Sequence, residues 1–229
     1  MEFLETIGNS VYTALIYEDR YKFILSGYGT TLLLTFASFL LGTALGALFC
    51  AMMCSKSKGL RRVAGIITQF FIQIPTLVLL MICAYIIFVE APFSVVVVAI
   101  IAFTIKTGSY MSDIFYSAMT SVNSGEVEAA RSLGMSRLQT FGKVRFAQAV
   151  RFALPLYRNQ FVQTLQETSV VGYIAIQDMT FASEVIAART LDPFASLLVI
   201  TVIYLLTGII VSKLLNIFAR EKHLEAVNV

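Results

Sequence analysis

EVEAARSLGMSRLQTFGKVRFAQAVRFALP, residues 126–155, is the stretch that decides how this chain is understood. It is polar and basic, and strongly apolar segments lie on both sides of it. A membrane protein that carries a folded basic loop between apolar segments usually presents that loop to a partner in the cytoplasm. The stretch therefore predicts a membrane protein with a cytoplasmic docking element.

Two helix starts and one helix stop are visible around this stretch. Asn123 with Glu126 three residues later has the pattern of a capping box, and a second such box begins at Ser136. Gly134 lies between them and is expected to break the helix, because glycine adopts turn conformations that other residues disfavour. We expect a helix, a sharp glycine turn and a second helix that ends near Arg151.

The composition excludes a soluble domain. Of the 229 residues, 58% are hydrophobic and only 14% are charged, which is typical of a bundle of membrane helices. A spanning helix needs about 20 apolar residues. Uncharged or nearly uncharged runs of this length cover residues 23–55, 63–89, 91–124 and 193–212. A fifth, more polar span is expected over residues 159–176, which predicts an all-α integral membrane protein with five transmembrane helices.

The distribution of Lys and Arg supports five spans and orients them. With five spans, the basic residues of the 56–62 loop, of the long loop after residue 124 and of the C-terminal tail all lie on one side. Cytoplasmic loops carry the excess of Lys and Arg in membrane proteins. We therefore predict an external N-terminus and a cytoplasmic C-terminus. A four-span chain would divide the basic loops between the two sides.

The spans divide the chain into three parts. Residues 1–22 are expected to form an amphipathic helix on the outer membrane surface, the alternative being a partly disordered N-terminus. Its apolar positions recur at helical spacing at Phe3, Ile7, Val11, Leu15 and Ile16. Residues 23–220 are expected to form the transmembrane domain, with a cytoplasmic loop over residues 121–158. Residues 221–229 are expected to be a cytoplasmic tail.

Small residues and a proline predict how the spans pack. Ser38, Gly42 and Gly46 form a face of small residues on the first span, which lets another helix approach closely. Pro75 lies within the second span and is expected to kink it, because proline removes a helix hydrogen bond. Freed backbone groups are tolerated only where they face protein or a wet cavity. Gln73 is expected to line such a cavity.

Three ionisable residues, Lys106, Asp113 and Glu167, lie within predicted spans. Such groups are costly in hydrocarbon, so each suggests a function. Lys106 and Asp113 share one helix face and are expected to line a polar pathway. The alternatives are a structural ion pair, or Lys106 reaching toward the membrane edge. Glu167 with the hydroxyls of Thr168 and Ser169 is suited to bind an ammonium group; alternatively, the hydroxyls bond to their own helix carbonyls.

The sequence shows no pattern of catalytic or metal-ligating residues. Cys50, Cys54 and Cys83 lie within spans without metal-ligand companions, so we expect packing roles, no metal site and no disulfide. A single histidine and the lack of an intramembrane catalytic constellation argue against a membrane-embedded enzyme. The sequence has no G-x-x-x-x-G-K-[ST] phosphate loop, so the chain is not expected to hydrolyse ATP itself.

A short motif in the central stretch resembles one found in a family of transporters. The residues that carry the resemblance are Glu128, Ala129, Ala130, Gly134 and Val144. Their spacing resembles the EAA motif of ABC importer permeases. The resemblance implies a type I ABC importer permease fold, in which a short helix docks into a groove on a separate ATPase subunit. It implies that the first four of these residues couple the permease to the ATPase, and that this partner binds ATP and Mg.

Two stretches within the spans are similar to elements of polar amino acid permeases. Ser109–Asp113 resembles the A-Y-x-x-E element of that family, and Gln166–Val171 resembles its K-D-T-S-L-V stretch. The resemblance is closest to the basic amino acid branch. It implies a solute-binding site, and the residues assigned to it are Glu167, Thr168, Ser169, Asp113 and Gln73.

The resemblance as a whole implies the transmembrane subunit of an ATP-driven importer of a polar or basic amino acid, working by alternating access in the bacterial cytoplasmic (inner) membrane. The implied partners are ATPase subunits, a second permease subunit and an extracytoplasmic amino-acid-binding protein, with membrane lipid around them and no nucleic acid. Three alternatives remain: the non-binding half of a heterodimeric permease for another small solute, a membrane-embedded enzyme and an ion channel. A channel would not need an EAA-like cytoplasmic loop.

Overall fold

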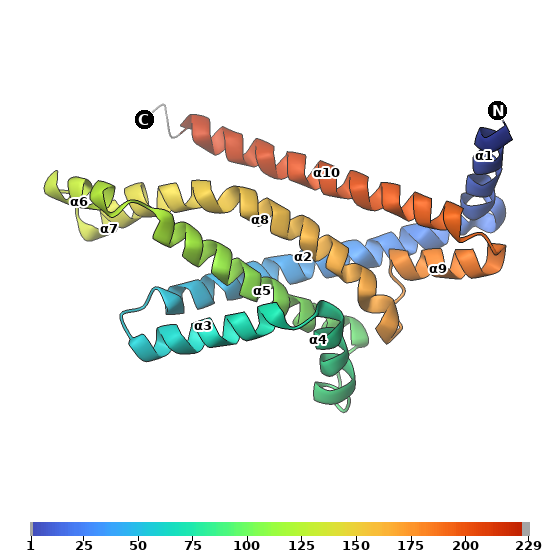
Figure 1. Ribbon diagram of the computed structural model, residues 1–229, viewed down its shortest axis with the longest axis horizontal. Helices are drawn as coiled ribbons and strands as arrows, with labels where there is room; N and C mark the ends of the chain where they lie inside the picture. The colour runs from blue at the N-terminus through green and yellow to red at the C-terminus, as the bar shows by residue number, and fades with distance from the viewer. Residues whose placement is uncertain (1, 226–229) are drawn as a thin grey trace. The chain divides into compact units, whose positions relative to one another are not determined.

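The computed structural model describes the backbone of residues 2–225 and the side chains within residues 10–215. Within residues 2–225 every regular element is a helix (Figure 1). The side chains of Phe3 and Ile7, and the part of the predicted tail beyond Glu225, lie outside the described residues. The last helix continues to Glu225, so the expected boundary after residue 220 falls inside a helix.

Ten α-helices and four shorter 3-10 or π segments make up the described chain. In order they are α1 (Glu2–Leu15), η1 (Tyr17–Asp19), α2 (Arg20–Met53), α3 (Lys58–Gln73), α4 (Thr76–Ile82), η2 (Cys83–Ile87), α5 (Val95–Ser121), α6 (Ser124–Ser132), α7 (Arg137–Thr140), η3 (Phe141–Phe146), α8 (Ala147–Glu167), η4 (Thr168–Ile174), α9 (Met179–Thr190) and α10 (Pro193–Glu225). They form two compact units, one of Met1–Ser38, Pro75–Phe103 and Val162–Val229, the other of Phe39–Ile74 and Thr104–Phe161. The helices α2, α5 and α8 contribute residues to both units.

Three stretches are single helices long and apolar enough to cross a membrane. They are Tyr17–Met53, Val95–Ser121 and Pro193–Leu215. Two further stretches meet the same test only as bent pairs: α3 with Thr76–Ile87, and Arg137–Ile174 with α9. The described chain thus holds three candidate spans, or up to five if each bent pair crosses the membrane once.

Pro75 breaks the second predicted span, as the sequence indicates. Helix α3 ends at Gln73, and α4 begins at Thr76 with Pro75 in the N-cap position. Ile74 and Pro75 are both extended, with ψ of 128° and 136°. Proline has no N–H and cannot continue the hydrogen-bond ladder of the helix before it, which explains the break.

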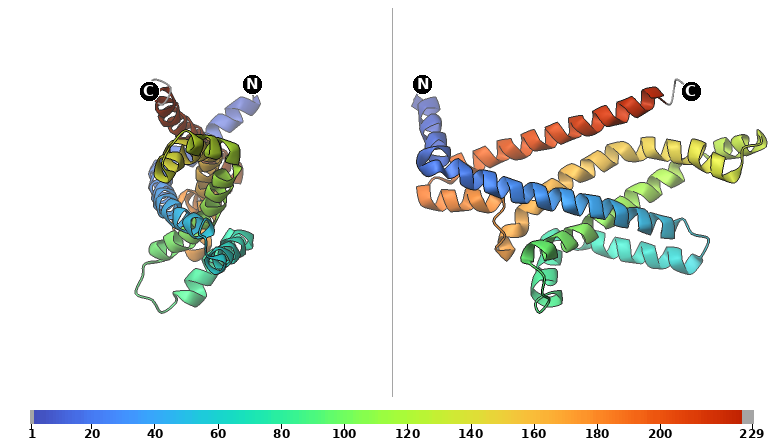
Figure 2. Two further views of the ribbon diagram at one scale, coloured as in Figure 1. Left: turned by 90° about the vertical axis from the view of Figure 1, so that its left-hand side faces the viewer. Right: turned by 180° about the vertical axis from the view of Figure 1, so that it is seen from behind.

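The N-terminal helix α1 packs against its own chain. Ala14 is buried in a cluster with α9 and the start of α10, and Val11 and Leu15 pack against the same cluster. Figure 2 shows α1 beside the ends of these two helices. The predicted helix is therefore present, but part of its apolar face covers protein. The physical reason is that burying apolar side chains against protein removes them from water.

Helix α9 is held by its N-terminal cap, an element that the sequence did not reveal. The Asp178 carboxylate accepts a hydrogen bond from the Phe181 N–H at 2.9 Å, and the Met179 N–H donates to the Thr31 hydroxyl of α2 at 3.2 Å. Gly27 of α2 lies so close that an added Cβ would be 2.5 Å from the Asp178 carbonyl oxygen. The small residue and the cap therefore join α2 to the start of α9.

In the second unit, α2 and α5 approach closely through glycines. A Cβ added to Gly42 would lie 2.8 Å from the Thr107 Cβ, and one added to Gly46 would lie 2.9 Å from the Gly108 carbonyl oxygen. The predicted small-residue face is thus confirmed at these two positions. Small residues at such a contact let two helix backbones come within van der Waals contact.

Gly46 and Gly29 form a matched pair for testing this contact. Gly46→Ala is expected to destabilise the protein by about 1–3 kcal/mol, because the new methyl group meets the backbone of α5, which cannot turn aside. Gly29→Ala, in the same helix, meets nothing within 4 Å and is expected to stabilise by about 0.5–1 kcal/mol through helix propensity. Thermal unfolding in detergent measures both. Equal shifts for the two variants would contradict the close contact.

Candidate functional site

The loop between α5 and α8 forms a compact turn of two helices, here called the knuckle (residues 123–140). The Asn123 side chain accepts a hydrogen bond from the Gly125 N–H at 2.9 Å and caps α6. The predicted capping box with Glu126 is not formed. The Glu126 carboxylate instead accepts a hydrogen bond from the Gln148 side chain at the start of α8, so it links α6 to α8.

The turn of the knuckle has the geometry that the sequence predicts. Gly134 has φ +85°, a value that favours glycine because a side chain there is strained. The Ser136 hydroxyl accepts from the Gln139 N–H at 3.2 Å, and the Gln139 side chain accepts from the Ser136 N–H at 2.8 Å. This reciprocal pair is the second predicted capping box, which is confirmed.

The knuckle exposes two large apolar side chains. Leu133 is 86% exposed and Leu138 is 80% exposed. Among the predicted coupling residues, Glu128 and Ala129 are exposed, whereas Ala130 is buried. Sequence reasoning missed both leucines. The signal for them was available, because each is a lone apolar residue beside the glycine turn in a polar segment.

The helix after the knuckle is longer than expected. The prediction that it ends near Arg151 is wrong: α7, η3, α8 and η4 form one helical run from Arg137 to Ile174. Pro155 lies inside α8 without ending it. The Arg145 guanidinium donates to the Met119 carbonyl near the end of α5 through Nε and Nη2, each at 3.2 Å. The Glu126 bond therefore ties the knuckle to α8, and the Arg145 bonds tie η3, which follows the knuckle, to α5.

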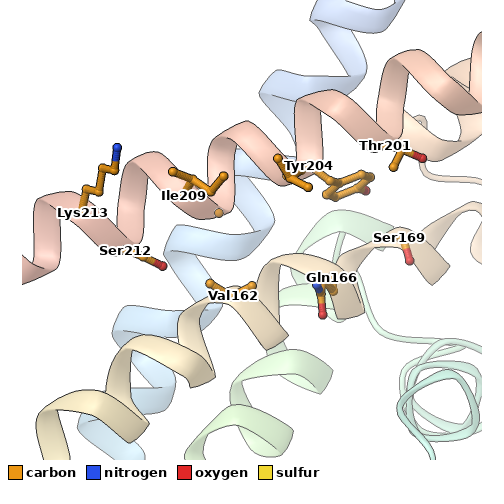
Figure 3. Close-up of a pocket in the computed structure, with 10 residues that line it drawn as sticks. Val162, Gln166, Ser169, Thr201, Tyr204, Ile209, Ser212 and Lys213 are labelled. Carbon is orange, nitrogen blue, oxygen red and sulfur yellow. The ribbon is translucent and has the colours of Figure 1, made fainter.

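A cavity of about 680 Å³ lies between α8–η4 and α10 in the first unit (Figure 3). Most of its surface is apolar, and polar groups are contributed by Gln166, Ser169, Thr201, Tyr204, Ser212 and Lys213. In Figure 3 the Tyr204 ring lies on the side of α10 that faces α8, whereas the Lys213 side chain extends away from α8. Tyr204 is also hydrogen-bonded to Thr180 of α9 at 3.2 Å. Such a cavity suits a small polar solute.

Of the solute-binding residues predicted in α8 and η4, only Ser169 lines this cavity. Ser169 lines the cavity, and so does Gln166, which sequence reasoning did not assign. The Gln163 side chain donates to the Glu167 carboxylate at 3.1 Å, and Glu167 is half-buried at the end of α8. The Thr168 hydroxyl is fully buried and donates to the Leu165 carbonyl at 2.7 Å. The alternative for Thr168, a bond to its own helix, is thus what the structure contains.

The polar residues predicted on the other spans do not form one stripe. Asp113 of α5 and Gln73 of α3 are exposed. Lys106 is 3% exposed, and its ammonium group donates to three carbonyl groups at the end of α3. The expected pathway face shared by Lys106 and Asp113 is therefore corrected. One side chain is enclosed in protein and the other is not, although both lie on one helix.

A second cavity, of about 670 Å³, lies in the second unit and is largely apolar. Cys50 and Cys54 contribute to its wall with Phe115, Phe141 and Tyr157. All three cysteines of the chain are free thiols. Cys50 is buried and Cys54 is exposed, and both have apolar neighbours in this cavity, which fits the packing roles predicted for them.

Comparison with known proteins places the chain in a family. Residues 42–223 match the family described as "Binding-protein-dependent transport system inner membrane component". The chain is 30% identical to the probable amino-acid ABC transporter permease protein YckA of Bacillus subtilis, over 81% of this chain and 83% of that protein. It is 26% identical to the histidine/lysine/arginine/ornithine transport system permease protein HisM of Salmonella typhimurium, over 91% and 92%.

Solved structures show the same fold. A chain of the structure described as "Crystal structure of an amino acid ABC transporter with histidines" has a TM-score of 0.79 and 28% identity, over 88% of this chain and 94% of that chain. A chain of the methionine ABC transporter MetNI in an inward-facing conformation has a TM-score of 0.69, and at 18% identity this likeness concerns the fold alone. The family match covers most of the chain. The chain belongs to the binding-protein-dependent transport system inner membrane components, and it is an ABC importer permease subunit rather than an enzyme.

Proposed function

We propose that this permease imports a polar or basic amino acid by alternating access, driven by ATP hydrolysis in a separate ATPase subunit. The observation that carries the proposal is the knuckle, an exposed turn of two helices that Glu126 bonds to α8 and that is followed by η3, which Arg145 bonds to α5. The relatives described as amino-acid permeases support the solute class. The cavity beside α8 and α10 provides a compartment of suitable size.

The knuckle is the proposed site of ATPase docking. Glu128 and Ala129 face solvent on α6, and Leu133 and Leu138 add exposed apolar surface next to them. Exposed apolar side chains rimmed by polar residues mark protein interaction sites. Ala130 is buried beneath this surface, and Gly134 sets the turn. Movement of a docked ATPase would reach the spans because the knuckle lies between α5 and α8 in the chain and Glu126 bonds it to Gln148 of α8.

A valine at Gly134 tests the coupling role. Nothing lies within 4 Å of a Cβ added there, so the whole effect comes from φ +85°, which a β-branched residue strongly disfavours. We expect Gly134→Val to lower solute-stimulated ATP hydrolysis of the reconstituted complex by at least about tenfold, since such strain is worth ~1–3 kcal/mol. Gly142→Val, also with nothing within 4 Å but without positive φ, is the control. Normal stimulated hydrolysis in Gly134→Val would contradict the coupling role.

Five spans with an external N-terminus and a cytoplasmic C-terminus are the proposed topology, in the bacterial inner membrane. In this topology each bent helix pair crosses the membrane once. The knuckle and the Lys58 end of α3 are then cytoplasmic, and α9 lies at the outer side. The basic residues gather on the cytoplasmic side, as the distribution of charge in membrane proteins favours.

Single cysteines introduced after removal of the three native thiols test this topology. A cysteine at Glu184, which is exposed on α9, should react with a membrane-impermeant maleimide added to intact spheroplasts. A cysteine at Lys58 or Arg137 should react only after the membrane is opened. Protection of the Glu184 position in intact spheroplasts would rule out the proposed orientation.

Glu167 is the proposed partner of the ammonium group of the solute. It lies between Gln166 and Thr168 at the junction of α8 and η4, and the Ser169 hydroxyl two residues later lines the cavity. Glu167 is not itself among the residues that line the cavity, which offers hydrogen-bond partners from its neighbour Gln166 and from Tyr204. Thr168 supports this junction through its bond to Leu165. Asp113 and Gln73, which are exposed in the second unit, are kept as proposed solute-binding residues.

Glu167→Gln removes the charge and keeps the shape. We expect transport at a solute concentration below saturation to fall by about tenfold or more, because a hydrogen bond to a charged group is worth ~1.5–3 kcal/mol. Glu184→Gln, an exposed carboxylate on α9, is the matched control and should transport normally. Uptake in proteoliposomes measures both, with co-purification of the ATPase as the test of assembly. Unchanged uptake in Glu167→Gln would favour the heterodimeric alternative, in which a partner permease holds the solute.

The proposed assembly joins two permease subunits, ATPase subunits and an extracytoplasmic amino-acid-binding protein. ATP and Mg belong to the ATPase in this proposal, and the permease holds no cofactor of its own. The family description, which ties the membrane component to a binding-protein-dependent system, supports the binding protein as a partner.

A further inference from the structure

Lys106 fills a pocket of backbone oxygens at the broken end of α3. Its Nζ lies 3.0 Å from the Phe71 carbonyl oxygen, 2.7 Å from that of Ile72 and 2.5 Å from that of Ile74. The Lys106 residue is 3% exposed. All four residues belong to the second unit, so this contact is local to one compact part of the chain.

The three carbonyl groups need a donor because the helix ends there. The last four carbonyl groups of an α-helix have no partner within the helix. For Phe71 the partner would be the N–H of residue 75, which is a proline and has none. An unpaired carbonyl group in an apolar environment is costly. Lys106 therefore supplies the hydrogen bond that Pro75 cannot give to Phe71, and it also serves the carbonyl groups of Ile72 and Ile74 where the helix stops.

The chemistry of the pocket is that of a cation site. An ammonium group has three N–H donors and no acceptor, which matches three converging oxygens. The C-terminal end of a helix carries partial negative charge and favours a cation. The Tyr110 ring, one turn further along α5, has its centroid 5.3 Å from Nζ and adds a cation–π contact. Rings of backbone carbonyl groups at broken helices bind monovalent cations in other membrane proteins.

We propose that the carbonyl groups of Phe71, Ile72 and Ile74 form a monovalent-cation site whose resident cation is the ammonium group of Lys106. Lys106 is a positioning residue for transport, because it holds the broken end of α3 in one shape. Its charge is neutralised by carbonyl dipoles and an aromatic face within the protein, which removes the need for it to reach the membrane edge. The proposal concerns no solute and stands apart from the assignment of Glu167.

Chemical rescue of Lys106→Ala tests the cation site directly. The substitution leaves a space that fits n-propylammonium, the part of the side chain that is lost. In proteoliposomes containing the complete transport complex, uptake by Lys106→Ala is expected to fall at least about tenfold, as for the loss of hydrogen bonds from a charged donor. Millimolar n-propylammonium should restore uptake several-fold, whereas 1-propanol, of equal length but uncharged, should not.

Lys106→Met is the matched control, because its uncharged side chain fills the same space. Its uptake should be low and should not respond to n-propylammonium. Thermal unfolding provides a readout apart from transport: n-propylammonium should raise the unfolding temperature of Lys106→Ala, since a ligand that binds only the folded state stabilises it. It should not raise that of Lys106→Met or of the natural protein.

Each result of these experiments either supports the proposal or overturns it. Wild-type uptake in Lys106→Ala, or a loss of uptake that n-propylammonium does not relieve, overturns the proposal. If Lys106→Ala does not assemble with the ATPase, the variant Pro75→Ala/Lys106→Ala decides, because alanine restores an N–H that can reach the Phe71 carbonyl. Recovered assembly in that variant supports the proposal, and absent recovery overturns it.

Discussion

Backbone polar groups inside an apolar helix bundle must find partners within the protein, because hydrocarbon offers none. This requirement accounts for the contacts on which the rest of the structure depends. Along the intact helices, the regular backbone hydrogen bonds satisfy it, and threonine hydroxyls that are buried or partly buried bond to the same carbonyl groups. Thr35, Thr43 and Thr207 each donate to the carbonyl group four residues earlier at 2.7 Å. At the break before Pro75, where the ladder stops, the ammonium group of Lys106 takes over.

The same requirement explains how the helix ends are held. Asn123 and Ser136 cap the two helices of the knuckle, and Asp178 caps α9. Arg145 satisfies the Met119 carbonyl in the last turn of α5, where a positive charge is also favoured by the helix dipole. Each cap fixes the direction in which the chain leaves a helix. Capped ends fix the shape of the knuckle, which suits the coupling role proposed for it.

The two cavities differ in chemistry although both are formed by helices of one apolar chain. The cavity of the first unit presents amide, hydroxyl and phenol groups from Gln166, Ser169 and Tyr204. The cavity of the second unit presents aromatic rings and small apolar groups, among them Phe115 and Phe141. A polar solute loses its hydration on entering a protein and needs hydrogen bonds in return. Of these two cavities, the first offers more hydrogen-bonding groups, which is why the proposed solute site lies there.

The sequence by itself determined the helical class, the break at Pro75, the close approach at Gly42 and Gly46, and the Gly134 turn with its Ser136 cap. These features depend on hydrophobic runs and on residues with special backbone geometry, both of which act locally along the chain. The family resemblance of the knuckle also rested on local spacing. The match over residues 42–223 agrees with it.

Only the tertiary structure decided which polar side chains meet each other and which meet backbone. Lys106 lies more than 30 residues from the carbonyl groups it serves, and Glu126 pairs with Gln148 rather than with its own N-cap. Asp113, on the same helix as Lys106, is exposed while Lys106 is enclosed. Spacing in sequence places side chains on one helix face but says nothing of what packs against that face. The partner of a buried polar group is set by the neighbouring helix, and that is known only once the helices have packed.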